Sequence, residues 1–223
     1  MANQLNAGRF SVQNLTEANA FIFRITHIKN VPWILRNGLH CKNSPVQDPY
    51  FVGIGNEDLI QKRTVKPVPI APHGTLSDYV PFYFTPHSPM MYNIHTGYGG
   101  ITQRRNDEIV IMASSLHKLS KDGVQFVFTD RHAYLAAAEF SSNLADLATL
   151  DWEILKDRDF KRDAEYPDKV ERYQAEALVH QEMAVESLLG IAASSPQVAD
   201  SLARMIEHAE RQLRVVVKPT WYF

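Results

Sequence analysis

The side chains best suited to chemistry in this chain lie in residues 172–180, which read Arg-Tyr-Gln-Ala-Glu-Ala-Leu-Val-His. If this stretch is extended, Gln174 and Glu176 project from the same face, because successive side chains of a strand alternate. A carboxylate and an amide would then lie side by side over a cleft. The competing interpretation is a helix, since Ala, Glu, Gln and Leu favour that structure. One helical face would hold the apolar side chains of Val170, Tyr173, Ala177 and Leu178, and the residue pattern alone slightly favours this helix.

Two further polar residues lie where secondary structure changes. Residues 21–26 predict a buried strand, and His27 follows where the chain passes into a helix that Asn30 caps. Such a junction often faces a ligand, although a structural histidine explains the pattern equally well. Arg63 ends a helix predicted over residues 56–63, where it is exposed unless a ligand or partner covers it.

The composition fits a single cytoplasmic domain with no leader and no membrane-spanning segment. The chain has 223 residues, of which 45% are hydrophobic and 22% charged, which suffices for one globular core. Because residues 1–12 are polar and no long apolar run follows, we expect neither a leader nor a spanning helix. The lone Cys41 excludes an internal disulfide framework and a cysteine-based zinc site, and no H-E-x-x-H pattern predicts a metal.

The charge argues against one class of partner. A formal net charge of −2 is unsuited to coating duplex DNA, although a local basic groove stays open. The basic residues between positions 156 and 172 alternate with acidic ones, so we interpret this stretch as a solvated mixed-charge surface.

Short apolar strands and capped helices are predicted along the rest of the chain. Strands are expected at 80–84, 108–113, 124–128, 191–193 and 215–217. Helices are expected at 16–20, from Ser88 and Pro89, from 129 to about 140, loosely over 144–155, and from Ser195 and Pro196. The long connection over residues 40–80 is interpreted as a lid over a binding site. We expect one domain over residues 1–223.

Five short motifs occur in order along the chain. They are Arg-Ile-Thr-His-Ile-Lys-Asn at 24–30, Asp-Tyr-Val-Pro-Phe-Tyr-Phe at 78–84, Ser-Pro-Met at 88–90, Phe-Thr-Asp at 128–130 and Gln-Ala-Glu at 174–176. Together they resemble the DarT family of bacterial toxins, which are DNA ADP-ribosyltransferases, over residues 21–190. The resemblance implies an α+β ADP-ribosyltransferase fold, in which a split central β-sheet with flanking helices and a lid clasps NAD.

The resemblance also implies a reaction and a partner. ADP-ribose would pass from NAD, the co-substrate, to a base of single-stranded DNA, with thymine as the first candidate. Nicotinamide would be released, and no metal would be needed. The partner would be an antitoxin of the DarG type, whose macrodomain removes the modification.

The same resemblance assigns roles to matching positions. It makes Glu176 the catalytic glutamate and Arg63 the catalytic and NAD-binding arginine. The expected NAD contacts are Thr26, His27, Ile28 and Asn30, with Tyr83 as a ring that stacks on the nicotinamide. The candidate substrate-binding residues are Gln174, His132 and Met90.

The chemistry agrees with a carboxylate at position 176. Loss of nicotinamide builds positive charge on the ribose in the transition state, which Glu176 could stabilise. A guanidinium is effectively always protonated and has no lone pair to accept a proton. We therefore expect Arg63 to clamp the NAD phosphates and polarise the base, with Glu176 or a water taking the imide proton. A base must be unstacked to react, and the candidate stacking side chains are Tyr50, Phe51 and Tyr92.

Two alternatives remain open at the level of the sequence. The first is ADP-ribosylation of guanine, RNA or protein. The second, from another class, is a catalytically inactive module that binds a nucleotide or DNA.

Overall fold

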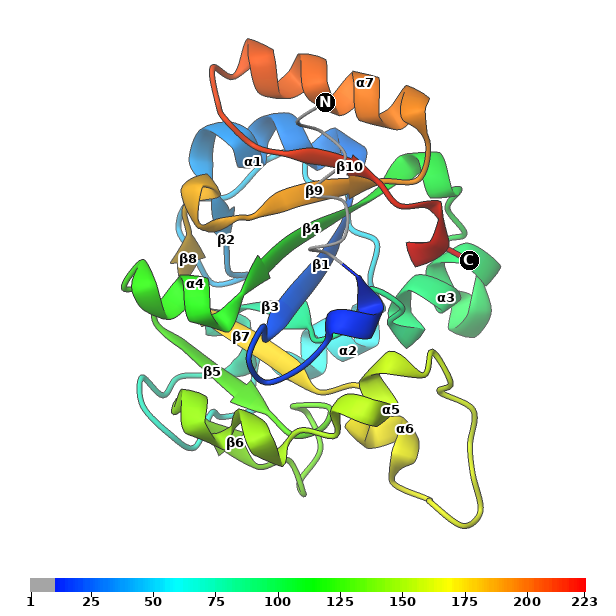
Figure 1. Ribbon diagram of the computed structural model, residues 1–223. Helices are drawn as coiled ribbons and strands as arrows, with labels where there is room; N and C mark the ends of the chain where they lie inside the picture. The colour runs from blue at the N-terminus through cyan, green and yellow to red at the C-terminus, as the bar shows by residue number, and fades with distance from the viewer. Residues whose placement is uncertain (1–10) are drawn as a thin grey trace.

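Ten strands form two sheets in the computed structural model, which describes residues 11–223 (Figure 1). The larger sheet has eight strands in the order β10-β9-β4-β1-β3-β7-β5-β6, and the smaller one pairs β2 with β8. The strands are β1 (Phe21–His27), β2 (Leu39–His40), β3 (Tyr79–Tyr83), β4 (Ile109–Ser115), β5 (Phe126–Thr129), β6 (Phe140–Ser141), β7 (Glu176–His180), β8 (Glu182–Met183), β9 (Gly190–Ala193) and β10 (Val215–Val217). The mixture of sheet and separate helices is the α+β class that the resemblance implied.

The large sheet divides at its centre. β1 pairs with β4 along its whole length, from Phe21 opposite Ser115 to His27 opposite Ile109. On its other side, β1 pairs with β3 at one position, where Phe23 lies opposite Tyr83. The two halves of the sheet therefore diverge beyond that pair, and the end of β1 is left beside a gap.

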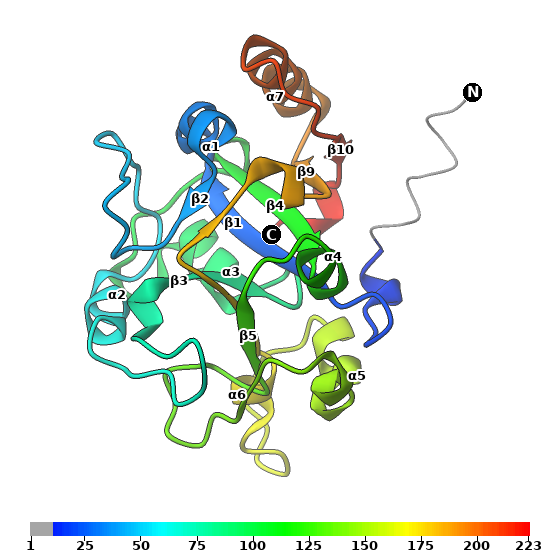
Figure 2. The same ribbon diagram turned by 90° about the vertical axis from the view of Figure 1, so that its left-hand side faces the viewer.

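Seven α-helices of the described residues lie around the sheet (Figures 1 and 2). They are α1 (Val31–Asn37), α2 (Glu57–Arg63), α3 (Pro89–Thr96), α4 (Leu116–Lys121), α5 (Trp152–Lys156), α6 (Lys169–Arg172) and α7 (Pro196–His208). α1 and α7 lie side by side, and their buried residues join the main core under the sheet, as Leu35 and Leu202 show. α3 covers a second core with Met91 and Ile94.

Helix boundaries follow the caps that the sequence predicted. Asn56 begins α2 by accepting the Leu59 N–H at 2.9 Å, and Ser88 begins α3 by accepting the Met91 N–H at 3.2 Å. Gly38 ends α1 with φ of 87°, a conformation that glycine adopts without steric cost.

The helix expected from Thr129 to about residue 140 is wrong. This segment is a loop, because two of its first backbone donors bond to distant residues and the later ones form only isolated turns. The His132 N–H donates to the Glu171 carbonyl at 3.0 Å, and the Ala133 N–H donates to the Glu176 carboxylate at 3.0 Å. The short helix expected at 16–20 is also absent, and a 3₁₀ turn lies earlier, at Val12–Asn14.

The stretch 172–180 divides between the two structures that its sequence allowed. Residues up to Arg172 belong to α6, and a turn follows before β7 begins at Glu176. Glu176 is therefore on an extended segment, but the strand is shorter than expected.

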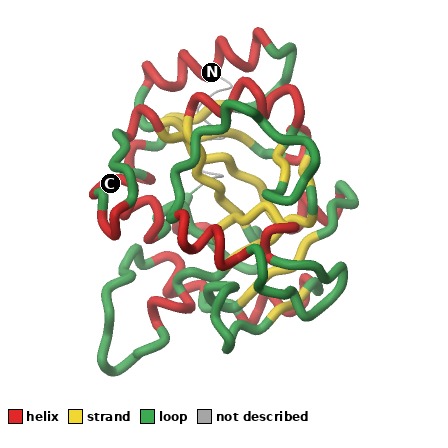
Figure 3. The backbone as a smooth tube through the Cα atoms, turned by 180° about the vertical axis from the view of Figure 1, so that it is seen from behind, coloured by secondary structure: helices red, strands yellow, loops and turns green. Residues whose placement is uncertain are grey.

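The segment between β2 and β3 lies over one side of the sheet, behind it in Figure 1 and towards the viewer in Figure 3. It consists of a loop over residues 41–56, then α2, then a second loop that ends in the 3₁₀ helix Leu76–Asp78. Within the described range, no helix is both long and apolar enough to cross a membrane. Residues 1–10, on which part of the expectation about a leader rests, lie outside the described range.

Candidate active site

Glu176 is a buried carboxylate, 2% exposed, at the first residue of β7. β7 is placed here because its apolar residues pair with β3 on one side and β5 on the other. The Glu176 N–H donates to the Thr129 hydroxyl at 3.2 Å, and that hydroxyl donates to the Arg131 carbonyl at 2.6 Å. The end of β5 therefore fixes the backbone from which the carboxylate projects.

Arg63 and the 131–135 loop hold the carboxylate from two sides. Nη1 of Arg63 lies 2.9 Å from Oε2 of Glu176 and 3.2 Å from Oε1. Oε1 also accepts the Ala133 N–H at 3.0 Å. Such donors offset the cost of burying a carboxylate. Arg63 is the last residue of α2, so its ion pair with Glu176 connects the segment over the sheet to the start of β7.

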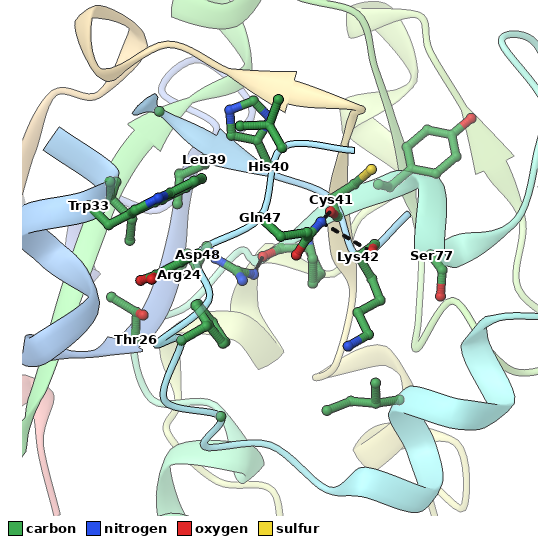
Figure 4. A pocket seen from close by; sticks show the side chains of 18 of the residues that line it. Arg24, Thr26, Trp33, Leu39, His40, Cys41, Lys42, Gln47, Asp48 and Ser77 are labelled. Atoms are coloured by element: carbon green, nitrogen blue, oxygen red, sulfur yellow. Dashed lines mark hydrogen bonds between the residues drawn. The ribbon is translucent and has the colours of Figure 1, made fainter. Parts of the chain in front are cut away.

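A cavity of about 530 Å³ extends from Arg63 between β1, α1, the 41–56 loop and β3 (Figure 4). Aromatic side chains line it at Trp33, His40 and Phe51, and cationic ones at Arg24, Lys42 and Arg63. Within residues 11–223, no group of three or more His, Cys, Asp or Glu side chains is placed to hold a metal ion.

Arg24 is a cation that the sequence analysis did not assign to the site. It projects from β1 into the cavity and donates from Nη1 to the Pro81 carbonyl at 2.9 Å. Burial, and then the nearby charge of Arg63, lower the pKa of Arg24 to about 10. Among the described residues no carboxylate lies within 4.0 Å of it, and its buried Nε makes no hydrogen bond. A charged residue inside an otherwise apolar strand was the available signal.

The donors around the cavity fit an anionic ligand. Nη2 of Arg63 is buried and, like Nε of Arg24, is without a hydrogen-bond partner in the described chain. A buried donor left unpaired is costly, so two guanidinium groups with spare donors at one cavity fit the phosphates of a dinucleotide. The aromatic end fits a flat base, and the volume is in the usual range for small-ligand sites.

His27 lies at the end of β1, but its ring is already bonded to protein. Nδ1 accepts the Lys29 N–H at 3.1 Å and so caps the 3₁₀ turn Ile28–Asn30, while Nε2 faces Oε1 of Glu108 at 3.6 Å. Burial lowers the pKa of His27 more than Glu108 raises it, which favours the neutral ring. Strand β3 lies between β1 and β7, so His27 and Glu176 are not on neighbouring strands.

Thr26 and Asn30 connect β1 to the loop over the cavity. Thr26 lines the cavity, and its hydroxyl accepts the Asn30 amide N–H at 3.1 Å. That amide also donates to the Val52 carbonyl at 3.0 Å and accepts the Val52 N–H at 2.8 Å. Asn30 therefore fixes the position of the 41–56 loop, and Ile28 packs beside it against the main core.

Tyr83 and His132 both lie close to Glu176. Tyr83 is its cross-strand partner on β3, and burial together with the Glu176 charge raises the pKa of the phenol, which stays protonated. Nδ1 of His132 accepts the Tyr134 N–H at 3.1 Å and lies 3.4 Å from Oε1 of Glu176. Met90, near the start of α3, packs against the second core and makes no hydrogen bond or ion pair with Glu176 in the described chain.

The expected pairing of Gln174 with Glu176 on one face of a strand is wrong. Gln174 lies in the turn after α6, where its amide donates to the Val170 carbonyl at 3.0 Å. The amide completes the last turn of that helix and does not orient the carboxylate.

The fold that carries this site matches solved structures of DarT proteins. The structure titled Thermus sp. 2.9 DarT in complex with ADP-ribosylated ssDNA superposes with a TM-score of 0.85, at 34% identity over 92% of this chain and 97% of that one. The same Thermus protein in complex with NAD+ gives a TM-score of 0.80 over 92% of this chain and 98% of that one. A DNA ADP-ribosyl transferase of Escherichia coli O127:H6 is 48% identical over 94% of this chain and 96% of its own length.

The class that fold and site define is therefore an NAD-dependent DNA ADP-ribosyltransferase. Residues 23–223 match the family described as "DarT: ssDNA thymidine ADP-ribosyltransferase", and the chain belongs to that family.

Proposed function

We propose that this protein transfers ADP-ribose from NAD to the imide nitrogen of thymine in single-stranded DNA, with Glu176 as the catalytic carboxylate. The observation that carries the proposal is the placement of Glu176. It is buried and held by the Ala133 N–H and Arg63. It is adjacent to a cavity lined by Arg24 and Arg63, each of which has one N–H group without a hydrogen-bond partner in the described chain. The function also fits the family to which the chain belongs.

Glu176 acts on the sugar in this proposal. NAD supplies an ADP-ribosyl group whose bond to nicotinamide breaks as positive charge grows on the ribose. The Glu176 carboxylate accepts a hydrogen bond from a ribose hydroxyl and stabilises that charge, which is effective because the site is shielded from water. Three of its roughly four acceptor positions are filled, by Ala133 and by two contacts of Arg63, so one remains.

Arg63 and Arg24 act on the phosphates. Nη1 of Arg63 holds Glu176, while its Nη2 and the Nε of Arg24, which have no hydrogen-bond partner in the described chain, would donate to phosphate oxygens of the bound dinucleotide. Thr26 and the backbone of His27 and Ile28 would hold the carboxamide of the nicotinamide, beside Tyr83, and Asn30 would keep the loop in place over them.

The proton of thymine must leave when its nitrogen bonds to the ribose. The new carbon–nitrogen bond forms as the bond to nicotinamide breaks, and the electron pair of that bond leaves with nicotinamide. We assign the proton to Glu176 or to a water beside it, because Arg63 has no lone pair to accept it. His132, 3.4 Å from the same carboxylate, would then be a neighbour of the reacting base, and Met90 would contact the DNA further from it.

The base is tested with NAD and single-stranded oligonucleotides that contain one thymine or none. We expect a mass gain of one ADP-ribosyl group on the thymine oligonucleotide, with nicotinamide released in equal amount. Modification of an oligonucleotide without thymine would favour guanine as the target. Absence of nicotinamide release with every oligonucleotide would mean that the chain is an inactive binding module.

The remaining parts of the proposal concern the setting of the enzyme. We propose one catalytic domain over residues 1–223, with residues 40–80 as a lid, acting in the cytoplasm. The partner would be an antitoxin of the DarG type, whose macrodomain removes the ADP-ribosyl group. Incubation of the modified oligonucleotide with such an antitoxin should restore the original mass, and an unchanged mass would contradict this pairing.

A further inference from the structure

Three aromatic side chains from distant parts of the sequence meet on one side of the molecule. Tyr92 of α3, Phe160 of the loop between α5 and α6, and Phe223 at the C-terminus have ring centroids 5.4 to 6.0 Å apart, in edge-to-face arrangements. Figures 1 and 3 both place α3, that loop and the C-terminus on the same side. Tyr92 is 40% exposed, and the other two rings are partly exposed. These three rings with Arg158 are called the aromatic platform below.

Arg158 adds a cation to this platform. Its guanidinium lies 4.8 Å from the centroid of the Phe223 ring and donates to the carbonyls of Thr220 at 3.4 Å and Tyr222 at 2.7 Å. In the described chain no carboxylate lies within 4.0 Å of it, whereas the neighbouring Asp159 is paired with Lys169. The positive charge of Arg158 is therefore held in place but not neutralised.

The platform is connected to the segment that carries Glu176. The Phe160 ring lies 5.5 Å from the ring of Tyr173, a fully buried residue whose hydroxyl donates to the His87 carbonyl at 3.0 Å. Tyr173 precedes Glu176 by three residues, so their Cα atoms are at most about 11 Å apart. A strand whose reacting base lies at Glu176 would thus carry its neighbouring nucleotide close to the platform.

We propose that the aromatic platform binds the nucleotide next to the reacting base of the single-stranded DNA. Aromatic rings that accept any base by stacking, beside a cation that attracts the phosphate backbone, are the combination by which proteins hold single strands. Mixed charge elsewhere in the loop does not oppose this, because Asp159 and Asp168 are already paired with Lys169 and Arg172. The inference rests on the proposed function, since it assumes that the base reacts at Glu176.

The test measures DNA binding without NAD, so that it does not depend on turnover. A thymine-containing oligonucleotide carries the fluorescent base 2-aminopurine on either side of the thymine. Binding to the full-length protein should change its fluorescence at one of the two positions. Tyr92→Ala should abolish that change and weaken binding about tenfold, which is in the range found for loss of one stacked base. Tyr92→Trp should retain both.

Arg158 is tested through salt dependence. Arg158→Gln should weaken binding and lower the slope of log affinity against log salt by about one, whereas Arg158→Lys should keep the slope. Tyr98→Ala is the matched control, because Tyr98 is exposed and close in sequence but outside the platform. It should bind DNA as the wild type does.

Two controls separate this inference from the proposed function and from a structural role. The NAD affinity of Tyr92→Ala should match that of the wild type, and its melting temperature should fall only by the few degrees expected for the loss of two ring contacts. If the wild type modifies thymine but Tyr92→Ala binds the oligonucleotide equally well, or loses NAD affinity and stability to the same extent, the platform is structural and the inference is wrong. If the wild type binds the oligonucleotide through Tyr92 but never modifies it, the proposed function fails and the binding surface stands.

Discussion

Glu176 lies at the start of β7 and His27 at the end of β1, and the two side chains are almost equally hidden, 2% and 3% exposed. Both ring nitrogens of His27 face protein groups, the Lys29 N–H and the Glu108 carboxylate. The carboxylate of Glu176 has donors on two sides and keeps one acceptor position, and the arginine that holds it has a spare donor. The comparison teaches that unused hydrogen-bonding capacity beside a cavity, more than residue type or burial, distinguishes a reactive position from a structural one.

The largest effect is expected at Arg63, which serves the reactive position. Arg63→Ala should lower kcat/KM by about 10³-fold, because it removes a donor to Glu176 and one to the phosphates at once. The measurement is the initial rate of nicotinamide release with a thymine oligonucleotide.

Arg63→Lys asks whether the arginine is a base. Lysine restores a positive charge but not the two-armed geometry, so activity should stay low at every pH. Recovery of most activity at high pH only would show that a base is needed at this position and would contradict our assignment of the proton to Glu176 or a water.

Arg24 is expected to strengthen NAD binding while it lowers the stability of the fold. Arg24→Met should weaken NAD binding about tenfold, roughly the 1.5 kcal/mol of a charged hydrogen bond. The same change should leave the melting temperature equal or higher, because it removes a buried cation whose pKa is lowered by burial. Titration calorimetry measures the NAD affinity, and thermal unfolding measures the stability. A variant that is less stable but binds NAD normally would show that Arg24 has a structural role, as His27 does.

His27 should behave in the opposite way. His27→Gln loses the cap of the 3₁₀ turn, which should cost about 1 kcal/mol and lower the melting temperature by about 2–4 °C. The KM for NAD should change by less than about threefold, since the ring is bonded to Lys29 and Glu108. A KM raised tenfold or more at an unchanged melting temperature would show that the ring contacts the ligand.

The smallest effect on activity is expected at His87, a third buried polar side chain. Burial lowers the pKa of His87 to about 4, from 6.5 in the unfolded chain. The unfolded state therefore binds a proton that the folded state does not, and stability is lost as pH falls from about 6.5 to about 4. The loss approaches about 3 kcal/mol. His87→Gln should flatten this part of the profile of unfolding free energy against pH, and an equally steep profile would assign the acid sensitivity to other groups.

The sequence predicted what depends on neighbours along the chain. The caps at Asn56 and Ser88, the stop at Gly38 and the strands β1, β3, β4, β5, β9 and β10 follow from local patterns, and the structure confirms them. The loop over residues 130–139 was taken for a helix because its backbone bonds to Glu171 and Glu176, more than thirty residues away.

The site was predictable to the extent that a motif marks it. Glu176 and Arg63 were assigned by resemblance, and the structure brings them into contact. Arg24 was missed because its exposure to the cavity depends on where β1 separates from β3, which no local pattern records. Gln174 was misplaced because a turn intervenes where an extended chain was assumed.

The most direct test of the central claim compares Glu176→Gln with the wild type, in NAD binding and in modification of a thymine oligonucleotide. The substitution keeps the size of the side chain but removes the charge that stabilises the ribose. We predict that NAD binds within about threefold of the wild-type affinity, while the rate of ADP-ribosyl mass gain falls by about 10³-fold or more. A variant that modifies DNA at nearly the wild-type rate would show that Glu176 is not the catalytic carboxylate.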